Sequence, residues 1–285
     1  MFRGFGYWCL IKIGLFLIFF KRGFYFLRVF MDIYALYIAI GLFTGILSGI
    51  FGIGGGMIIV PIMLATGHSF EESIGISILQ MALSSFVGSV LNFKKKSLDF
   101  SLGLLIGAGG LIGASFSGFI LKIVSSKILM VIFALLVVYS MIQFVLKPKK
   151  KDLITDTKRY HLQGLKLFLI GALTGFFAIT LGIGGGMLMV PLMHYFLGYD
   201  SKKCVALGLF FILFSSISGA FSLMYHHIIN KEVLLAGAIV GLGSVMGVSI
   251  GIKWIMGLLN EKIHKALILG VYGLSLLIVL YKIFF

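Results

Sequence analysis

The sequence predicts an all-α integral membrane protein with about eight transmembrane helices, arranged as two homologous halves that each contain a glycine-broken helix or short hairpin. Long apolar segments, a low charge content and an internal repeat support this fold class. Of the 285 residues, 60% are hydrophobic and only 12% are charged, and the mean hydropathy is +1.14. A soluble domain carries about a quarter charged residues. This composition excludes a soluble enzyme, a secreted disulfide scaffold and a disordered basic tail.

Eight apolar segments meet or approach the roughly 20 residues that a helix needs to cross a bilayer core. Two shorter apolar pieces, 57–67 and 187–197, follow the first and fifth segments, and each is too short to cross alone as a straight helix. The eight long segments are residues 33–53, 72–92, 100–121, 127–146, 164–183, 203–225, 232–256 and 262–282.

The first 30 residues form no clean span, because four cations interrupt them: Lys12, Lys21, Arg22 and Arg28. We expect residues 1–32 to be an N-terminal extension, either an interfacial or extra helix or the product of an over-extended gene start, and residues 1–30 to be dispensable. A chain that starts at Met31 should still insert into the membrane.

The cations predict an orientation. There are 24 Lys and Arg against 9 Asp and Glu, a formal net charge of +15. They interrupt apolar runs, as in the loops of membrane proteins. If each long segment crosses once, the nineteen cations after residue 32 divide into twelve on the side of the central loop and seven on the other. Because cytoplasmic loops carry the excess of Lys and Arg, we expect the central loop in the cytoplasm. The first side would hold Lys94, Lys95, Lys96, Lys147, Lys149, Lys150, Lys151, Lys158, Arg159, Lys166, Lys231 and Lys282, and the second Lys122, Lys127, Lys202, Lys203, Lys253, Lys262 and Lys265.

The internal repeat is the strongest signal in the chain. Residues 41–63 (GLFTGILSGIFGIGGGMIIVPIM) and 171–193 (GALTGFFAITLGIGGGMLMVPLM) are identical at twelve of 23 positions. Beyond a one-residue insertion, the pair Ser84 and Ser85 aligns with Ser215 and Ser216. We therefore expect a first transmembrane repeat at 33–146, a basic cytoplasmic linker at 147–163 and a second repeat at 164–285. Four crossings per half would give a parallel repeat, whereas a fifth crossing at GIGGG would give an inverted one.

Each GIGGG motif should break its helix, because a helical glycine costs about 1 kcal/mol relative to alanine. A helix that restarts after the break begins with N–H groups that have no intrahelical partner and carry the positive end of its dipole. Two such ends facing each other would form an anion site of backbone donors. The expected donors are Gly54, Gly55, Gly56, Gly184, Gly185 and Gly186. The more widely spaced glycines, Gly41, Gly45, Gly49, Gly243, Gly247 and Gly251, are expected only to let helices approach closely.

Neutral side chains within the spans complete the candidate binding site. Thr44 and Thr174 are equivalent positions just before the breaks, and Gln80 shares a helix face with Ser84. Ser84, Ser85, Ser215 and Ser216 are duplicated candidates, although a hydroxyl in a membrane helix also bonds to its own backbone. All nine acidic residues lie at segment ends or in loops, which favours an anion over a cation as the ligand.

The remaining polar residues carry weaker signals. His194 is expected to be a packing or interfacial residue rather than a proton carrier, and His226 and His227 a solvated boundary. The two cysteines, Cys9 and Cys204, are expected to be small buried hydrophobes. No nucleophile–base pair and no metal-ligand spacing appears in the sequence, so we expect no catalytic site, no metal and no cofactor.

The paired segments G-x-x-x-G…GIGGG-x-x-x-VP at 41–63 and 171–193, in a basic two-half membrane protein, resemble the sulfite exporter TauE/SafE family. The resemblance covers most of residues 33–282, and the segment GISILQMALSSFVGSVLNFKKKSLDF also fits it, with Ile76 where a threonine is usual. It implies a multi-pass carrier in the bacterial inner membrane for sulfite, sulfonates or related sulfur-containing organic anions.

The function expected from the sequence is therefore outward secondary-active transport of a small anion by alternating access between the halves. An anion channel and a non-transporting scaffold acting through the basic 147–166 loop are the alternatives. The expected partners are the anion, the lipid bilayer and a second copy in a homodimer, but no nucleic acid.

Overall fold

The structure of this chain is a computed structural model that describes residues 33–52, 54–96, 98–145, 160–197, 201–255 and 261–284. It divides into two units, Met1–Tyr37 and Ile38–Phe285. In the first unit only residues 33–37 are described, and they are helical. The expectations for residues 1–30 fall outside the described residues.

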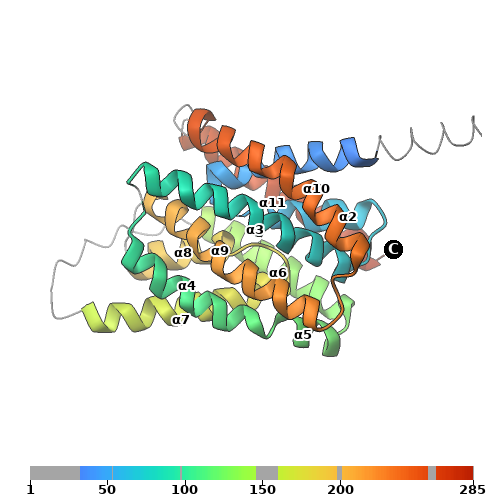
Figure 1. Cartoon of the computed structure of the whole chain (residues 1–285), viewed down its shortest axis with the longest axis horizontal. Coiled ribbons are helices and arrows are strands. Elements are labelled where there is room, and N and C mark those ends of the chain that lie inside the picture. The colour runs from blue at the N-terminus through green and yellow to red at the C-terminus, as the bar shows by residue number, and fades with distance from the viewer. Residues whose placement is uncertain are drawn as a thin grey trace, which may run out of the picture. The chain divides into compact units, whose positions relative to one another are not determined.

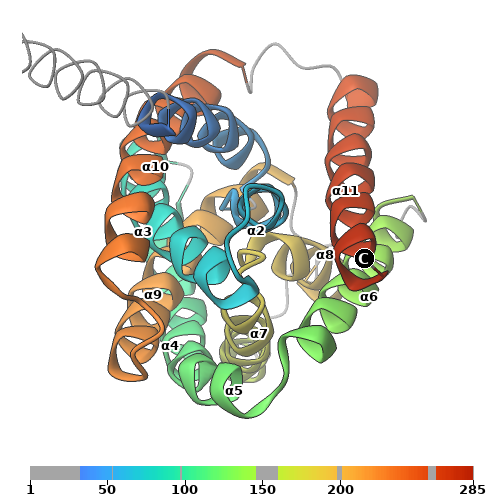
Figure 2. The same ribbon diagram turned by 90° about the vertical axis from the view of Figure 1, so that its right-hand side faces the viewer.

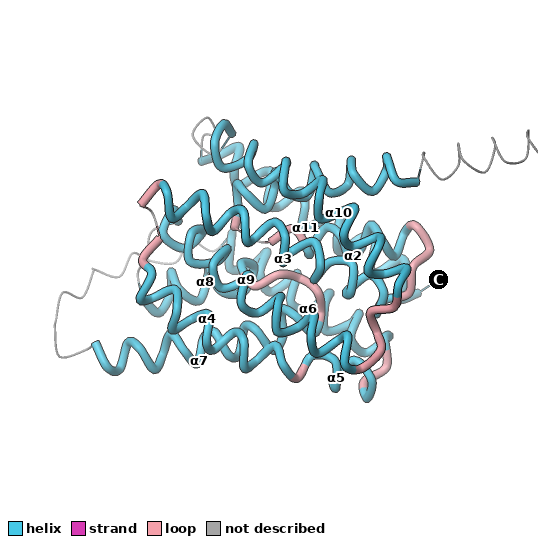
Figure 3. The backbone as a smooth tube through the Cα atoms, viewed as in Figure 1, coloured by secondary structure: helices cyan, strands magenta, loops and turns pink. Residues whose placement is uncertain are grey.

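Within the described residues every regular element is a helix (Figure 3). The first half contains helix Ile33–Phe51, α2 (Gly56–Ala65), α3 (Phe70–Lys94), α4 (Phe100–Ser115), α5 (Ser117–Ile123) and α6 (Ser126–Val145). The second half repeats this order with α7 (Tyr160–Thr180), α8 (Gly186–Leu197), α9 (Ser201–Tyr225), α10 (Lys231–Ile250), a π-helical end η2 (Gly251–Ile255) and α11 (Glu261–Phe284) (Figure 1). Seven helices in the described part are long and apolar enough to cross a membrane, and Gly164–Thr180 is a shorter apolar helix. The protein is thus an all-α membrane protein.

Local sequence explains where several long helices begin. Ser69 and Glu72 form a capping box at α3, in which Glu72 N–H donates to Ser69 Oγ (3.2 Å) and Ser69 N–H to Glu72 Oε2 (2.9 Å). Asp99 accepts from Leu102 N–H at the start of α4, and Asn230 accepts from Val233 N–H at the start of α10. These polar caps end the loops and start the apolar spans.

The repeat has inverted topology. The equivalent helices α3 and α9 run antiparallel, because Gly88 of α3 lies against Leu209 and Gly219 of α9 lies near Ile78. Helix α10 runs parallel to α3 and α4 runs parallel to α9, so α4 and α10 are antiparallel as well. Of the two arrangements that the sequence leaves open, the structure therefore has the inverted one.

The halves interlock rather than stand apart. Helix Ile33–Phe51 packs against α10 of the second half, with Gly41 and Gly49 against Val240 and Val248. In the symmetry-related contact, α7 packs against α4, with Gly175 against Gly110. The expectation that the widely spaced glycines permit close helix approach is confirmed, since a methyl group at any of them would overlap the neighbouring backbone.

The short helices α2 and α8 lie inside the unit. Helix α2 packs against α3 on one side and α11 on the other, while α8 packs against α9, α7 and α6 (Figure 2). Pro61 within α2 has no N–H to donate to the Met57 carbonyl, and Ser275 Oγ of α11 donates to that oxygen instead (3.0 Å). The proline thus leaves an acceptor that a neighbouring helix satisfies.

Inverted topology corrects the predicted placement of seven lysines. We call the two ends of the unit the Glu71 face, where α3, α6 and α10 begin, and the Lys95 face, where α3 and α10 end. Ser126 Oγ bonds to Glu71 on the first face, and Lys95 Nζ donates to the Ile252 carbonyl (2.8 Å) on the second. Lys202, Lys203, Lys253, Lys262 and Lys265 therefore lie on the Lys95 face, and Lys231 and Lys282 on the Glu71 face.

The corrected count sharpens the orientation. Among the described residues, nine lysines lie toward the Lys95 face and four toward the Glu71 face, and the basic 147–159 segment joins two helix ends of the Lys95 face. The predicted sides were wrong because the prediction counted four crossings per half. The break and the short helix after it add a fifth pass through the unit, which inverts the second half relative to the first. By the positive-inside rule we expect the Lys95 face in the cytoplasm, and the linker 147–163 stays predicted as cytoplasmic.

Candidate functional site

The first glycine break ends one helix and starts another in the middle of the unit. Helix Ile33–Phe51 stops at Phe51, and α2 begins at Gly56. Gly52, Gly54 and Gly55 have φ of 67°, 83° and 78°, a left-handed region that residues with a side chain rarely adopt. Both Ile58 N–H and Ile59 N–H donate to the Gly55 carbonyl. The N–H groups of Gly56 and Met57 precede them and have no intrahelical acceptor.

The second break repeats this backbone. Helix α7 ends at Thr180 and α8 begins at Gly186. Gly182 and Gly184 have φ of 65° and 84°, close to the values at Gly52 and Gly54. Gly185, in contrast, does not share the left-handed φ of Gly55. Met189 N–H donates to the Gly185 carbonyl (2.9 Å) as the first bond of α8.

The two breaks meet each other. A methyl group on Gly56 would collide with the Gly182 carbonyl oxygen, and one on Gly208 of α9 would lie 3.1 Å from the Gly52 oxygen and 4.0 Å from Gly186 Cα. Since the halves are inverted, α2 and α8 lead away from this contact toward opposite faces. The start of each short helix, the positive end of its dipole, therefore lies in the buried middle of the unit.

Four predicted residues gather at the first break: Thr44, Gly55, Gln80 and Ser84. A methyl group on Gly55 would lie 3.1 Å from both Gln80 Nε2 and the Thr44 carbonyl oxygen. Gln80 Nε2 donates to Ser84 Oγ (3.3 Å), and Ser84 Oγ donates to the Met81 carbonyl (3.3 Å). All these side chains are fully buried, and Gln80 Oε1 has no hydrogen-bond partner among the described residues.

The second break has no such polar group beside it. The position equivalent to Gln80 is Phe211, whose ring lies against Gly185 and Gly110. Ser215 Oγ donates to the Phe211 carbonyl (3.0 Å), and Thr174 Oγ1 is buried without a partner. Gly54, predicted as a donor on the first break, also borders the apolar side chains Met81 and Ile212.

Three further predicted hydroxyl ligands donate to carbonyl groups of their own helices. Ser85 Oγ donates to the Ala82 carbonyl and Ser216 Oγ to the Leu213 carbonyl (3.3 Å each), and Thr44 Oγ1 donates to the Ile40 carbonyl (2.8 Å). These groups hold their own helices, the alternative that the sequence had left open. They become ligand donors only if they rotate.

Two residues outside the predicted binding site, Ser77 and Gly208, join the breaks. Ser77 Oγ donates to the Gly182 carbonyl (2.8 Å) and so links α3 to the second break. Its equivalent in the second half is Gly208, which leaves room for Gly52. The alignment of the serine pair already places Ser77 opposite Gly208, and this difference between the halves was the available signal.

The site is closed. A cavity of about 10 Å³ borders Gly55 and Ser48, and it is otherwise lined by apolar residues of helix Ile33–Phe51, α2 and α11. A single water molecule needs roughly this volume. A multi-atom ligand would enter only after helices separate.

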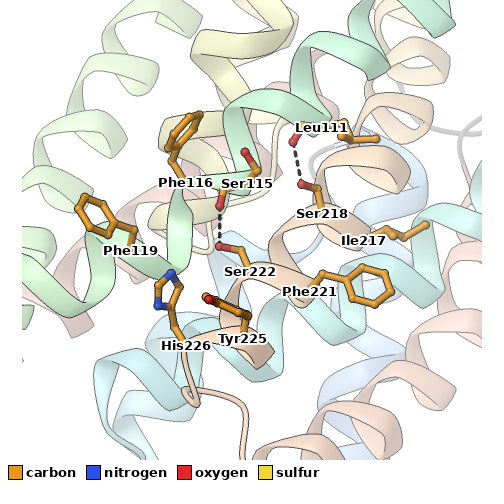
Figure 4. Close-up of a pocket in the computed structure, with 10 residues that line it drawn as sticks. All are labelled: Leu111, Ser115, Phe116, Phe119, Ile217, Ser218, Phe221, Ser222, Tyr225 and His226. Carbon is orange, nitrogen blue, oxygen red and sulfur yellow. Dashed lines mark hydrogen bonds between the residues drawn. The ribbon is translucent and has the colours of Figure 1, made fainter.

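A larger cavity lies elsewhere, in a groove of about 760 Å³ on the surface of α4, α5 and α9 (Figure 4). Exposed aromatic residues, among them Phe116, Phe119 and Phe221, line it. The hydroxyls of Ser218 and Ser222 donate to the Leu111 and Ser115 carbonyls. It contains none of the predicted site residues, and its apolar lining is typical of a lipid-facing surface.

Two further expectations concern ions. Among the described residues no group of three or more His, Cys, Asp or Glu is placed to hold a metal ion. His194 belongs to α8, but its side chain lies outside the described residues. Its predicted packing role stays a prediction.

Comparison with known proteins identifies relatives. Residues 37–279 match the family described as Sulfite exporter TauE/SafE. The chain is 28% identical over 270 residues to the probable membrane transporter protein MJ0441 of Methanocaldococcus jannaschii, covering 87% of this chain and 97% of the relative. It is 26% identical to the probable membrane transporter protein YunE of Bacillus subtilis (71% and 82% covered) and 22% to YfcA of Escherichia coli K12 (76% and 78%). No solved structure matches the chain.

Proposed function

Because this chain belongs to the sulfite exporter TauE/SafE family and its relatives are membrane transporters rather than enzymes, we propose that it is a secondary-active exporter of a small anion. The anion is sulfite, a sulfonate or a related sulfur-containing organic anion. The observation that carries this proposal is the pair of buried glycine breaks, from which two short helices start back to back.

The breaks supply positive potential, and no Lys or Arg among the described side chains is buried. Helix starts bind anions through free N–H groups and the dipole, and in a low-dielectric interior such donors interact more strongly than in water. The proposed backbone ligands are Gly54, Gly55 and Gly56 in the first half and Gly184, Gly185 and Gly186 in the second. Thr44, Gln80, Ser84, Ser85, Thr174, Ser215 and Ser216 are the proposed side-chain ligands.

The bodies that move past each other in alternating access are not the two sequence halves. Helix Ile33–Phe51 and α3 pack with α10, and α2 packs against α3. In the same way α7 and α9 pack with α4, and α8 packs against α9 and α7. Each group takes three elements from one half and one from the other. The glycine-to-backbone contacts within each group resist separation, so we propose that the groups slide or rock along the α3–α9 contact.

Counterflow in proteoliposomes tests this function. Vesicles loaded with unlabelled sulfite should transiently accumulate labelled sulfite from outside, because a carrier exchanges its substrate across the membrane. An anion channel would dissipate the gradient without accumulation. A scaffold would show no flux, and deleting the basic 147–159 segment would abolish its activity. Absence of counterflow with sulfite, methanesulfonate and thiosulfate would refute the carrier.

A further inference from the structure

The two breaks place different side chains at equivalent positions, and the difference indicates what the site selects. Gln80 and Phe211 are equivalent positions of the repeat, because the alignment that pairs Ser84 with Ser215 also pairs Gln80 with Phe211. In the structure each lies on the central helix of its half, α3 or α9, against the second glycine of its GGG run, Gly55 or Gly185. They thus occupy the same place relative to their short helix.

The Gln80 amide is oriented by its neighbour. Ser84 Oγ gives its only proton to the Met81 carbonyl, so toward Gln80 it can only accept, and Nε2 is the atom that faces it. The carbonyl oxygen Oε1 is left without a partner in a fully buried side chain. A methyl group on Gly55 would lie 3.4 Å from that oxygen, which places Oε1 beside the start of α2. A buried acceptor without a donor is costly, and a ligand is one way to satisfy it.

Phe211 does the opposite at the second break. Its ring is fully buried and fills the space over Gly185, and a methyl group at Gly185 would overlap it. A phenyl ring offers neither a donor nor an acceptor. The second break therefore has a backbone like the first but no side-chain site of its own.

We infer that the carrier has one polar substrate position, at the first break, which narrows the ligands proposed above to those of the first half, and that Gln80 makes it specific for oxyanions that still carry a proton. This inference rests on the proposed function. The N–H groups at the start of α2 donate hydrogen bonds to the anionic oxygens, whereas Oε1 accepts a hydrogen bond from the hydroxyl group of the anion. A fully deprotonated oxyanion would place a negative oxygen against Oε1 and repel it. Phe211 closes the equivalent position and prevents binding of a second anion.

The test compares two monoanions of similar size on the purified full-length protein by isothermal titration calorimetry. Hydrogen sulfite, supplied as sulfite at mildly acidic pH, carries a proton, whereas methanesulfonate at the same pH does not. Wild-type protein should bind hydrogen sulfite more tightly, with a stoichiometry of one. Gln80→Leu should reduce the affinity ratio of hydrogen sulfite to methanesulfonate by about tenfold, the worth of one hydrogen bond to a charged group.

Phe211→Leu is the matched control, because it changes the equivalent buried side chain and should leave the ratio unchanged. If Gln80→Leu does not fold, Gln80→Met keeps the chain length and removes the same acceptor. An unchanged ratio in the Gln80 variants, or an equal fall in Phe211→Leu, would overturn the inference and leave the transport proposal standing. Binding of neither anion by the wild-type protein, with no counterflow, would instead overturn the proposed function.

Discussion

The two GIGGG breaks have identical sequences and similar backbone conformations at their first two glycines, yet different side chains surround them. Gly52 and Gly182 share φ near 66°, and Gly54 and Gly184 share φ near 84°. Beside the first break lies the Gln80 amide, and beside the second lies the Phe211 ring. The glycines therefore determine where the chain leaves the helix, whereas α3 and α9 determine what chemistry the break meets. A duplicated motif need not give a duplicated site.

The largest expected effect concerns the contact that both breaks share. A methyl group at Gly56 would meet the Gly182 carbonyl oxygen, which is backbone and has no flexible end to move aside. Gly56→Ala should destabilise the protein by about 3 kcal/mol or more. Thermal unfolding of the detergent-purified protein measures it. Gly273→Ala in α11, where the added methyl meets nothing within 4 Å, is the control and should be neutral or slightly stabilising. Equal melting temperatures for both variants would contradict the packing of the breaks.

A second experiment separates the breaks by their neighbours. Gly185→Ala should be rescued in part by Phe211→Leu, because the obstacle is a side chain, with a coupling free energy of about 1–3 kcal/mol. Gly55→Ala should not be rescued by Gln80→Ala, because its cost comes from the left-handed φ of 78°. Double-mutant cycles of unfolding measure both couplings. Rescue of Gly55→Ala by Gln80→Ala would show that the cost at Gly55 is a steric clash with a side chain, as at Gly185, and would contradict the assignment of that cost to the left-handed φ.

A smaller effect is expected where α3 ties the halves together. Ser77→Ala removes the hydrogen bond to the Gly182 carbonyl and should cost about 1 kcal/mol of unfolding free energy. Ser85→Ala on the same helix loses only a bond to its own backbone and should change stability by less than about 0.5 kcal/mol. Chemical or thermal unfolding of the two single variants distinguishes them. The reverse order would mean that Ser77 does not link the breaks.

Much of the fold could be predicted because apolar length and caps are local signals. The long segments and the glycine pattern lie in the sequence, and the close-approach role of Gly41 and Gly247 followed from spacing alone. The inverted topology could not be predicted, because α2 and α8 have only 10 and 12 residues. Whether such a short helix counts as a crossing depends on its tertiary partners. Because the short helices were not counted as crossings, Lys202 and Lys231 were predicted on the wrong faces of the protein.

The candidate site was predictable only in part. Gln80 and Ser84 were expected on one face from four-residue spacing, and the structure joins them through a hydrogen bond. Phe211 was overlooked because an aromatic residue in an apolar helix carries no chemical signal by itself. Its meaning appears only when the repeat places it opposite Gln80 and the structure puts both against a glycine.

The most direct test of the account is to locate an anion in the protein. Selenite is a close chemical analogue of sulfite, and its selenium scatters X-rays anomalously. A crystal of the full chain grown with selenite should give one anomalous peak within hydrogen-bonding distance of the Gln80 amide and the first turn of α2. A peak beside Gly185 and Phe211, a peak confined to the surface groove, or no peak at saturating selenite would contradict the claim that the first break is the substrate site.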